Sequence, residues 1–206
     1  MGNGNKVEML IAICAVLTSA IAVFIAWDQG RVMRAQQHGA VYPVVQIEGF
    51  VSSSPEMVSM GLRISNSGVG PALIEHVDVS KGGVPVKSLT PYADKFPSGY
   101  QQSWSSLIGR AIAPGKEVIP LRVDWSRERV SVADRDAAAL AWSALDVEIC
   151  YCSVFNKCWT ATGLNMGTTM SRAEPVKRCE RSDEDVFEAL ANYVPKPETD
   201  MTAEVE

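Results

Sequence analysis

The sequence predicts a mainly β protein, in which an N-terminal transmembrane helix precedes an antiparallel β-sandwich. A long uncharged apolar run stands near the N-terminus. Short runs of alternating apolar and polar residues follow, and turns rich in glycine and proline separate them. The 206 residues suffice for one ordinary domain with an appendage, and 47% hydrophobic residues exclude a largely disordered chain. A net charge of -5 gives no basic footprint for nucleic acid.

The apolar run extends from Met9 to Trp27 without a charged residue. At about 1.5 Å per residue, a helix of this length spans close to the roughly 30 Å hydrocarbon core of a bilayer. Trp27 stands where an interfacial aromatic residue belongs, and Arg31 and Arg34 follow it. We therefore expect residues 9–27 to hold the chain in the lipid bilayer as a single-pass anchor of the inner (cell) membrane.

This segment has two other interpretations. A cleaved signal peptide has Lys6 as its charged region and Thr18–Ala20 or Ala20–Ala22 as its cleavage site, but the apolar run continues past both. A lipoprotein site at Cys14 is disfavoured by the bulky Ile13 before it. An uncleaved anchor is the prediction. The charges on its two sides are nearly balanced, with a slight lean towards a cytoplasmic domain.

Four cysteines lie in the last third of the chain, and Cys14 lies in the anchor. The segment Leu145–Cys152 alternates strictly, which places two of the four on the face away from the core. An even number of such cysteines favours two disulfides, an oxidising compartment and therefore a periplasmic domain. The sequence leaves three connectivities open, and zinc binding or reduced cytoplasmic thiols remain alternatives. The candidate disulfide cysteines are Cys150, Cys152, Cys158 and Cys179.

The predicted domain organisation has three parts. Residues 1–38 form an N-terminal tail, the transmembrane helix and a helical extension that ends before Gly39. Residues 39–165 form the sandwich. Residues 166–206 form a tail with a short amphipathic helix, capped at Ser182 and stopped at Pro195, and an acidic end.

The predicted strands alternate between an inward and an outward face. One strand is expected to direct Ile119, Leu121, Val123 and Trp125 inwards, and Ser131 with Asp134 predicts the start of a short helix. The strand-like runs cover residues 44–50, 57–65, 73–79, 84–89, 117–125, 145–152 and 158–162.

The strongest local signature is the loop Asn66-Ser-Gly68-Val-Gly70-Pro71 between two predicted strands. Its glycines and asparagine permit a positive φ, and Pro71 restricts the exit. A phosphate-binding loop would need a Lys-Ser/Thr pair and a following helix, and both are missing. We therefore expect a structural inter-strand loop.

This N-x-G-x-G-P-A loop resembles one found in small bacterial single-pass membrane-anchored proteins of unknown function with an immunoglobulin-like β-sandwich domain. The segment Tyr151–Trp159 resembles their Y-x-D-x-x-G-x-x-(F/W) hairpin but departs from it at Ser153 and Asn156. The stretch Arg34–Pro43 resembles the junction after their anchor. The resemblance implies an immunoglobulin-like sandwich and carries no known activity.

No catalytic, cofactor-binding or metal-binding residue is predicted. Of the two histidines, His38 follows the anchor and His76 lies in a strand, so neither belongs to a recognisable triad. The clustered acidic residues are interpreted as helix caps and solvated faces: Asp134, Asp136, Asp183, Glu184 and Asp185.

The sequence therefore predicts a non-enzymatic, membrane-anchored interaction or assembly module. Its expected partner is another membrane or periplasmic protein, or a second copy of the chain. The alternatives are a cytoplasm-facing cysteine-based redox or metal-binding module and an enzyme of unrecognised type.

Overall fold

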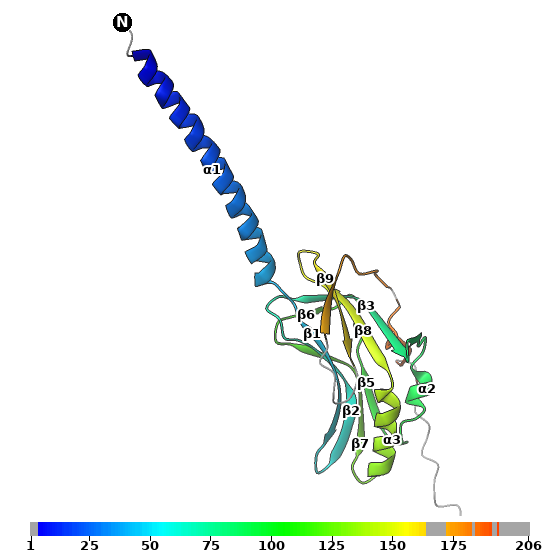
Figure 1. Cartoon of the computed structure of the whole chain (residues 1–206). Helices are drawn as coiled ribbons and strands as arrows, with labels where there is room; N and C mark the ends of the chain where they lie inside the picture. The colour runs from blue at the N-terminus through cyan, green and yellow to red at the C-terminus, as the bar shows by residue number, and fades with distance from the viewer. Residues whose placement is uncertain (1–3, 164–171, 183, 191–192, 194–206) are drawn as a thin grey trace, which may run out of the picture. The chain divides into compact units, whose positions relative to one another are not determined.

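The computed structural model describes residues 4–163, 172–182, 184–190 and 193 (Figure 1). The chain forms two compact units, residues 1–40 and residues 41–206.

The first unit is a single helix, α1 (Gly4–Ala40). It is long and apolar enough to cross a membrane, and an 18-residue stretch of it has a mean hydropathy of 2.7. Thr18 and Ser19 donate hydrogen bonds to carbonyls about one turn earlier, as hydroxyls in an apolar medium must. The helix continues through Gly39, past the end predicted at residue 38. A glycine weakens a helix by only about 1 kcal/mol, so it need not end one.

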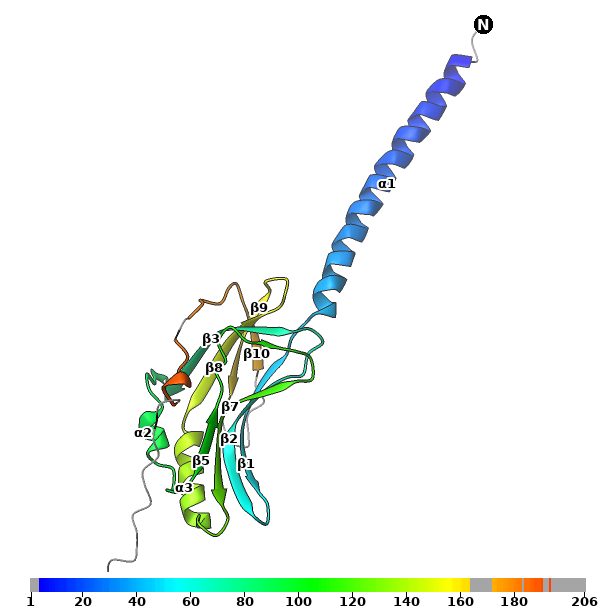
Figure 2. The ribbon, with the colours of Figure 1, turned by 180° about the vertical axis from the view of Figure 1, so that it is seen from behind.

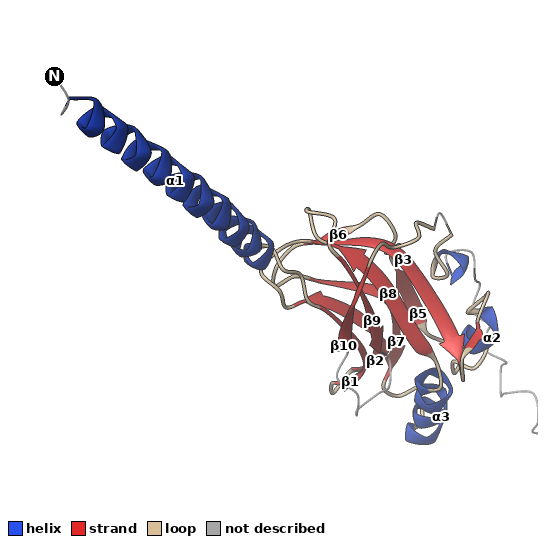
Figure 3. Cartoon of the chain, turned by 45° about the horizontal axis from the view of Figure 1, so that its top comes forward, coloured by secondary structure: helices blue, strands red, loops and turns tan. Residues whose placement is uncertain are grey.

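The second unit consists of two antiparallel sheets, which form the two layers visible in Figure 3. The first sheet has the order β1-β2-β7-β5, and the second has the order β10-β9-β8-β3-β4, with β6 also paired to β3. The predicted mainly β class with two antiparallel sheets is confirmed. The strands of the first sheet are β1 (Val45–Ser53), β2 (Met57–Asn66), β5 (Gln101–Trp104) and β7 (Glu117–Ser126). Those of the second are β3 (Ala72–Lys81), β4 (Val84–Pro85), β6 (Ala111–Ile112), β8 (Asp146–Cys152), β9 (Cys158–Gly163) and β10 (Arg172–Val176).

Short helical segments complete this unit: α2 (Thr90–Ala93), α3 (Val132–Ser143) and a 3-10 helix, η1 (Glu188–Leu190). Helix α3 begins as predicted, because the Ser131 side chain accepts a hydrogen bond from the backbone N–H of Asp134. It lies at the end of the sheets away from β6 (Figures 1 and 3).

The core lies between the sheets and contains most of the apolar residues that were predicted to point inwards from alternating strands. The inward residues of β2 and β8 are all buried. The prediction for β7 is wrong at Ile119. Ile119 and Val118 are both partly buried, but it is Val118 that packs against the core. A register shift is the cause, because Val118 pairs with Ile64 whereas Leu121 pairs with Leu62.

The segment after residue 165 adds to the second sheet. Strand β10 pairs with β9 along five residues. Its sequence is too short to show an alternation from which the strand could have been predicted. In the described residues after Ser182, a 3-10 turn replaces the predicted amphipathic helix. Phe187 and Leu190 are buried in the core, so their apolar spacing reflects docking against the sandwich. Val194 and the acidic end lie outside the described residues.

Candidate functional site

The loop after β2 is joined by a single buried amide to the segment that leads into β1. Asn66 is completely buried, and its Nδ2 donates to the carbonyls of Gly70 (2.8 Å) and Ile112 (2.9 Å). Its Oδ1 accepts from the backbone N–H groups of Val44 (3.1 Å) and Gly68 (3.0 Å). One side chain therefore satisfies four backbone groups in three separate segments.

The two glycines of this loop allow backbone to approach backbone. A Cβ on Gly68 would lie 2.3 Å from the Tyr42 carbonyl oxygen, and a Cβ on Gly70 would lie 2.2 Å from that of Val41. Neither glycine has a positive φ, so the predicted reason for their presence is wrong. Pro71 follows and leads directly into β3. We call residues 41–44 together with loop 66–71 the entry clasp.

Aromatic side chains hold the same segment from the second sheet. The ring of Tyr42 meets Trp159 edge-on at 4.9 Å between centroids, and Trp159 stacks on Tyr151 at 6.0 Å. The Tyr151 hydroxyl accepts a hydrogen bond from the backbone N–H of Val45 (3.4 Å). Burial raises the pKa of the Tyr151 phenol, so this hydroxyl stays protonated at neutral pH. Both sheets thus fix the start of β1.

The four cysteines outside the anchor form two disulfides, Cys150–Cys179 and Cys152–Cys158. Cys150 and Cys152 lie on the face of β8 opposite the core residues, as the alternation predicted. All four cysteines are buried in a cluster of their own with Val176. The first disulfide ties the segment after β10 to β8, and the second closes the β8–β9 hairpin. The sequence left the pairing open because the position of Cys179 depends on how β10 pairs with β9, which the sequence does not show.

The sulfur atoms of Cys152, Cys158 and Cys179 lie within 4.8 Å of one another, a spacing that also suits a metal ion. Zinc binds thiolates, and each of these sulfurs is instead bonded to a second sulfur. In the oxidised form, the cluster therefore joins chain segments and offers no thiolate to a metal.

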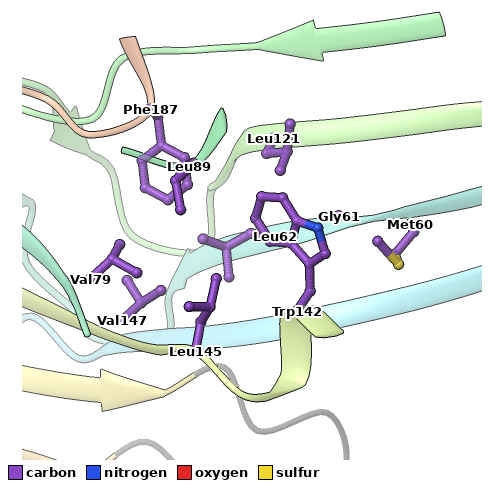
Figure 4. A pocket seen from close by; sticks show the side chains of 10 residues that line it. All are labelled: Met60, Gly61, Leu62, Val79, Leu89, Leu121, Trp142, Leu145, Val147 and Phe187. Carbon is purple, nitrogen blue, oxygen red and sulfur yellow. The ribbon is translucent and has the colours of Figure 1, made fainter. Parts of the chain in front are cut away.

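Two cavities are candidate ligand sites. The more enclosed one is an apolar gap between the sheets, of about 10 Å³, lined by the side chains that Figure 4 shows pointing into the core. It has room for about one water and no polar group to hold it. Its lining residues are Met60, Gly61, Leu62, Val79, Leu89, Leu121, Trp142, Leu145, Val147 and Phe187.

The second cavity is an open groove of about 410 Å³ beside β3. Here His76 Nε2 lies 2.7 Å from Asp78 Oδ2, which is the geometry of an oriented imidazole. Ser182 lines the same groove, but its hydroxyl donates to the Glu184 carbonyl and accepts from the Glu184 backbone N–H. The groove therefore holds an acid–base pair without a nucleophile directed at it.

Asp185 has a role that the sequence analysis missed, because it is buried and not a solvated helix residue. One carboxylate oxygen accepts from Ser106 Oγ (3.0 Å), Leu107 N (2.6 Å) and Ile108 N (3.3 Å). The other accepts from Phe187 N (3.0 Å). The carboxylate fastens the tail to the loop before β6. In the sequence, only the apolar residues that follow Asp185 could have indicated that it is buried.

Comparison with known proteins gives a family and no activity. A family model described as "Domain of unknown function (DUF8453)" matches residues 9–168. The matched residues include the apolar run, the entry clasp and three of the four disulfide cysteines, whereas Cys179 lies beyond them. No curated protein matches the chain.

Proposed function

The chain belongs to the DUF8453 family, a domain of unknown function, and on that premise we propose a role from its geometry. The protein is a membrane-anchored, non-enzymatic interaction or assembly module. Its immunoglobulin-like sandwich lies on the periplasmic side and binds an extended segment of another membrane or periplasmic protein, or of a second copy. The observation that carries this proposal is the open edge of β1.

Strand β1 is the longest edge strand of the two sheets. Among the described residues it pairs with β2 alone. The other edges are protected, because β4 has two residues, β5 has four, and β10 has five with Pro175 among them. In β1 the stretch Gly49–Ser53 has no buried residue, no proline and no charge. Within the part of the chain that the structure describes, no strand pairs with the outer edge of this stretch, so its backbone groups suit pairing with an added strand.

The disulfides support the choice of compartment. Disulfides persist in oxidising compartments, and here they join a tail and a hairpin to the same strand. The length and apolar character of α1 support the proposal that the domain is tethered to a membrane. A domain held at the membrane meets other membrane proteins at a high effective concentration, so a single short edge suffices for useful binding.

Site-specific cross-linking tests this proposal. A photo-cross-linking amino acid replaces Val51, which is 40% exposed in the open half of β1, and the full chain is irradiated in its native membranes. We expect discrete protein adducts of defined mass. The matched control places the same amino acid at Leu140 in α3, which is 73% exposed and lies outside both sheets. No protein adduct at Val51, or the same adducts at both positions, would refute the role of the edge.

A further inference from the structure

We propose that one end of the sandwich docks on the anionic surface of a lipid bilayer. This end, which we call the entry end, comprises residues 41–44 and the loops 67–71, 105–116 and 153–157. Strand register brings them together, as Figures 1 and 2 show for the loops around β6 and β9. The pairs that define the end are Val45 with Asn66, Ser65 with Glu117, Ala72 with Ile112, and Leu73 with Cys152.

Apolar side chains stand exposed at the tips of two of these loops. Val69 is 65% exposed, and Val154 and Phe155 are 49% and 46% exposed. Both loops are held from below, the first by the entry clasp and the second by the disulfide Cys152–Cys158 at the base of its hairpin. At the tip, Asn156 adopts a φ of 55°. Asparagine tolerates this conformation, so the tip keeps its shape.

Cationic residues surround these tips. The loops of the entry end contain Arg110, Lys116 and Lys157 and no acidic residue. Lys177 and Arg178 follow β10, whose last residue pairs with Cys158, and Glu180 is the first acidic residue after them. All five cations are exposed, and none of them forms an ion pair within the residues that the structure describes.

This charge distribution is opposite to that of the whole chain, which has a net charge of -5. Some cations elsewhere are neutralised, as at Arg63, which lies 3.6 Å from Glu48 and 3.3 Å from Glu117. A basic end on an acidic protein complements a surface of lipid phosphates. Exposed apolar residues among lysines and arginines suit a headgroup layer, in which apolar groups enter the acyl boundary while cations meet phosphate.

The tether permits the contact. The chain enters the sandwich at this end, directly after a helix long enough to cross a membrane. Val32 and Met33 extend the exposed apolar surface of α1 beyond Trp27, and the neighbouring arginines can snorkel to the interface. The helical residues from Arg34 to Ala40 then rise only about 10 Å, which is close to the Debye length at physiological salt.

Lipid cross-linking of the full chain tests the proposal. The purified protein carries a photo-cross-linking amino acid at Val154 and is reconstituted into vesicles of phosphatidylcholine alone or with phosphatidylglycerol. We expect lipid adducts at Val154 that are several-fold more abundant with phosphatidylglycerol and that decline at high salt. The same amino acid at Leu140, on the opposite end, serves as the control. Labelling at Val154 that does not exceed labelling at Leu140 would overturn the proposal.

A matched pair of charge reversals separates local docking from net charge. Lys157→Glu should lower the Val154 lipid adducts roughly fivefold or more, since each surface cation contributes about that factor. Lys87→Glu, an exposed lysine after β4 and outside the entry end, should leave them unchanged. Equal losses in both variants would contradict the proposal. The Val51 protein adducts report separately on the β1 edge, so either proposal can fail without the other.

Discussion

At the residue scale, Asn66 joins more separate parts of the backbone than any other side chain in the clasp. Its amide provides two donors and an acceptor, and the four backbone groups around it require that arrangement. An aspartate would place carboxylate oxygen against the carbonyls of Gly70 and Ile112. A leucine would leave all four groups without these partners in a buried site.

We therefore predict that Asn66→Ala lowers the free energy of unfolding by about 3–5 kcal/mol, because buried backbone groups lose their partners. Urea unfolding in detergent, followed by tryptophan fluorescence, measures the change. Ser67→Ala is the control next to it, because the Ser67 hydroxyl bonds only the exposed Gln46 side chain. The control should change stability by less than about 0.5 kcal/mol. Equal effects in the two variants would show that the amide does not stabilise the clasp.

At the element scale, the two disulfides have different structural roles. Cys152–Cys158 closes a hairpin that the β8–β9 hydrogen bonds already define. Cys150–Cys179 holds a segment attached to the second sheet by one five-residue strand and by the Asp185 carboxylate. The sequence separations are 6 and 29 residues, so the second disulfide restricts the unfolded chain more.

Removing the long-range disulfide should therefore be the more damaging change. Cys150→Ser with Cys179→Ser is expected to lower stability by about 4 kcal/mol, and Cys152→Ser with Cys158→Ser by about 2 kcal/mol, from loop-closure entropy. Paired replacement avoids a stray thiol in either variant, so each serves as the control for the other. Urea midpoints in detergent measure both, and the reverse order would mean that strand pairing, not the disulfide, holds the tail.

At the scale of the whole molecule, one apolar helix and a disulfide-linked sandwich together favour export of the domain. The charges that flank the apolar run favour neither direction clearly. In our proposal the disulfides outweigh these flanking charges, because disulfides rarely persist in a reducing compartment.

Reporter fusions test the direction. A periplasm-dependent phosphatase fused to the C-terminus should be active in a bacterial host, and a fluorescent protein that folds only in the cytoplasm should be dark at the same position. Without reductant, a maleimide should modify no cysteine but Cys14, the free cysteine of the chain. The opposite reporter pattern, or labelling of four further thiols, would place the domain in the cytoplasm and remove the support for the proposed compartment.

The sequence by itself determined the apolar helix and the inward face of most strands. An apolar run of membrane-spanning length and a period-two alternation are local properties, since each depends only on residues near one another in the sequence. The face of β8 that carries Cys150 and Cys152 was predictable for the same reason. The loop at Asn66 was also recognisable, although the reason inferred for its glycines was wrong.

The tertiary structure decided the rest, because it determines which distant segments meet. A register shift between β2 and β7 brought Val118 to the core in place of Ile119. Docking of the tail buried Asp185 against backbone N–H groups about 78 residues away in the chain, and it brought Cys179 to Cys150. Such pairings depend on non-local packing and chain closure, which no short window of sequence contains.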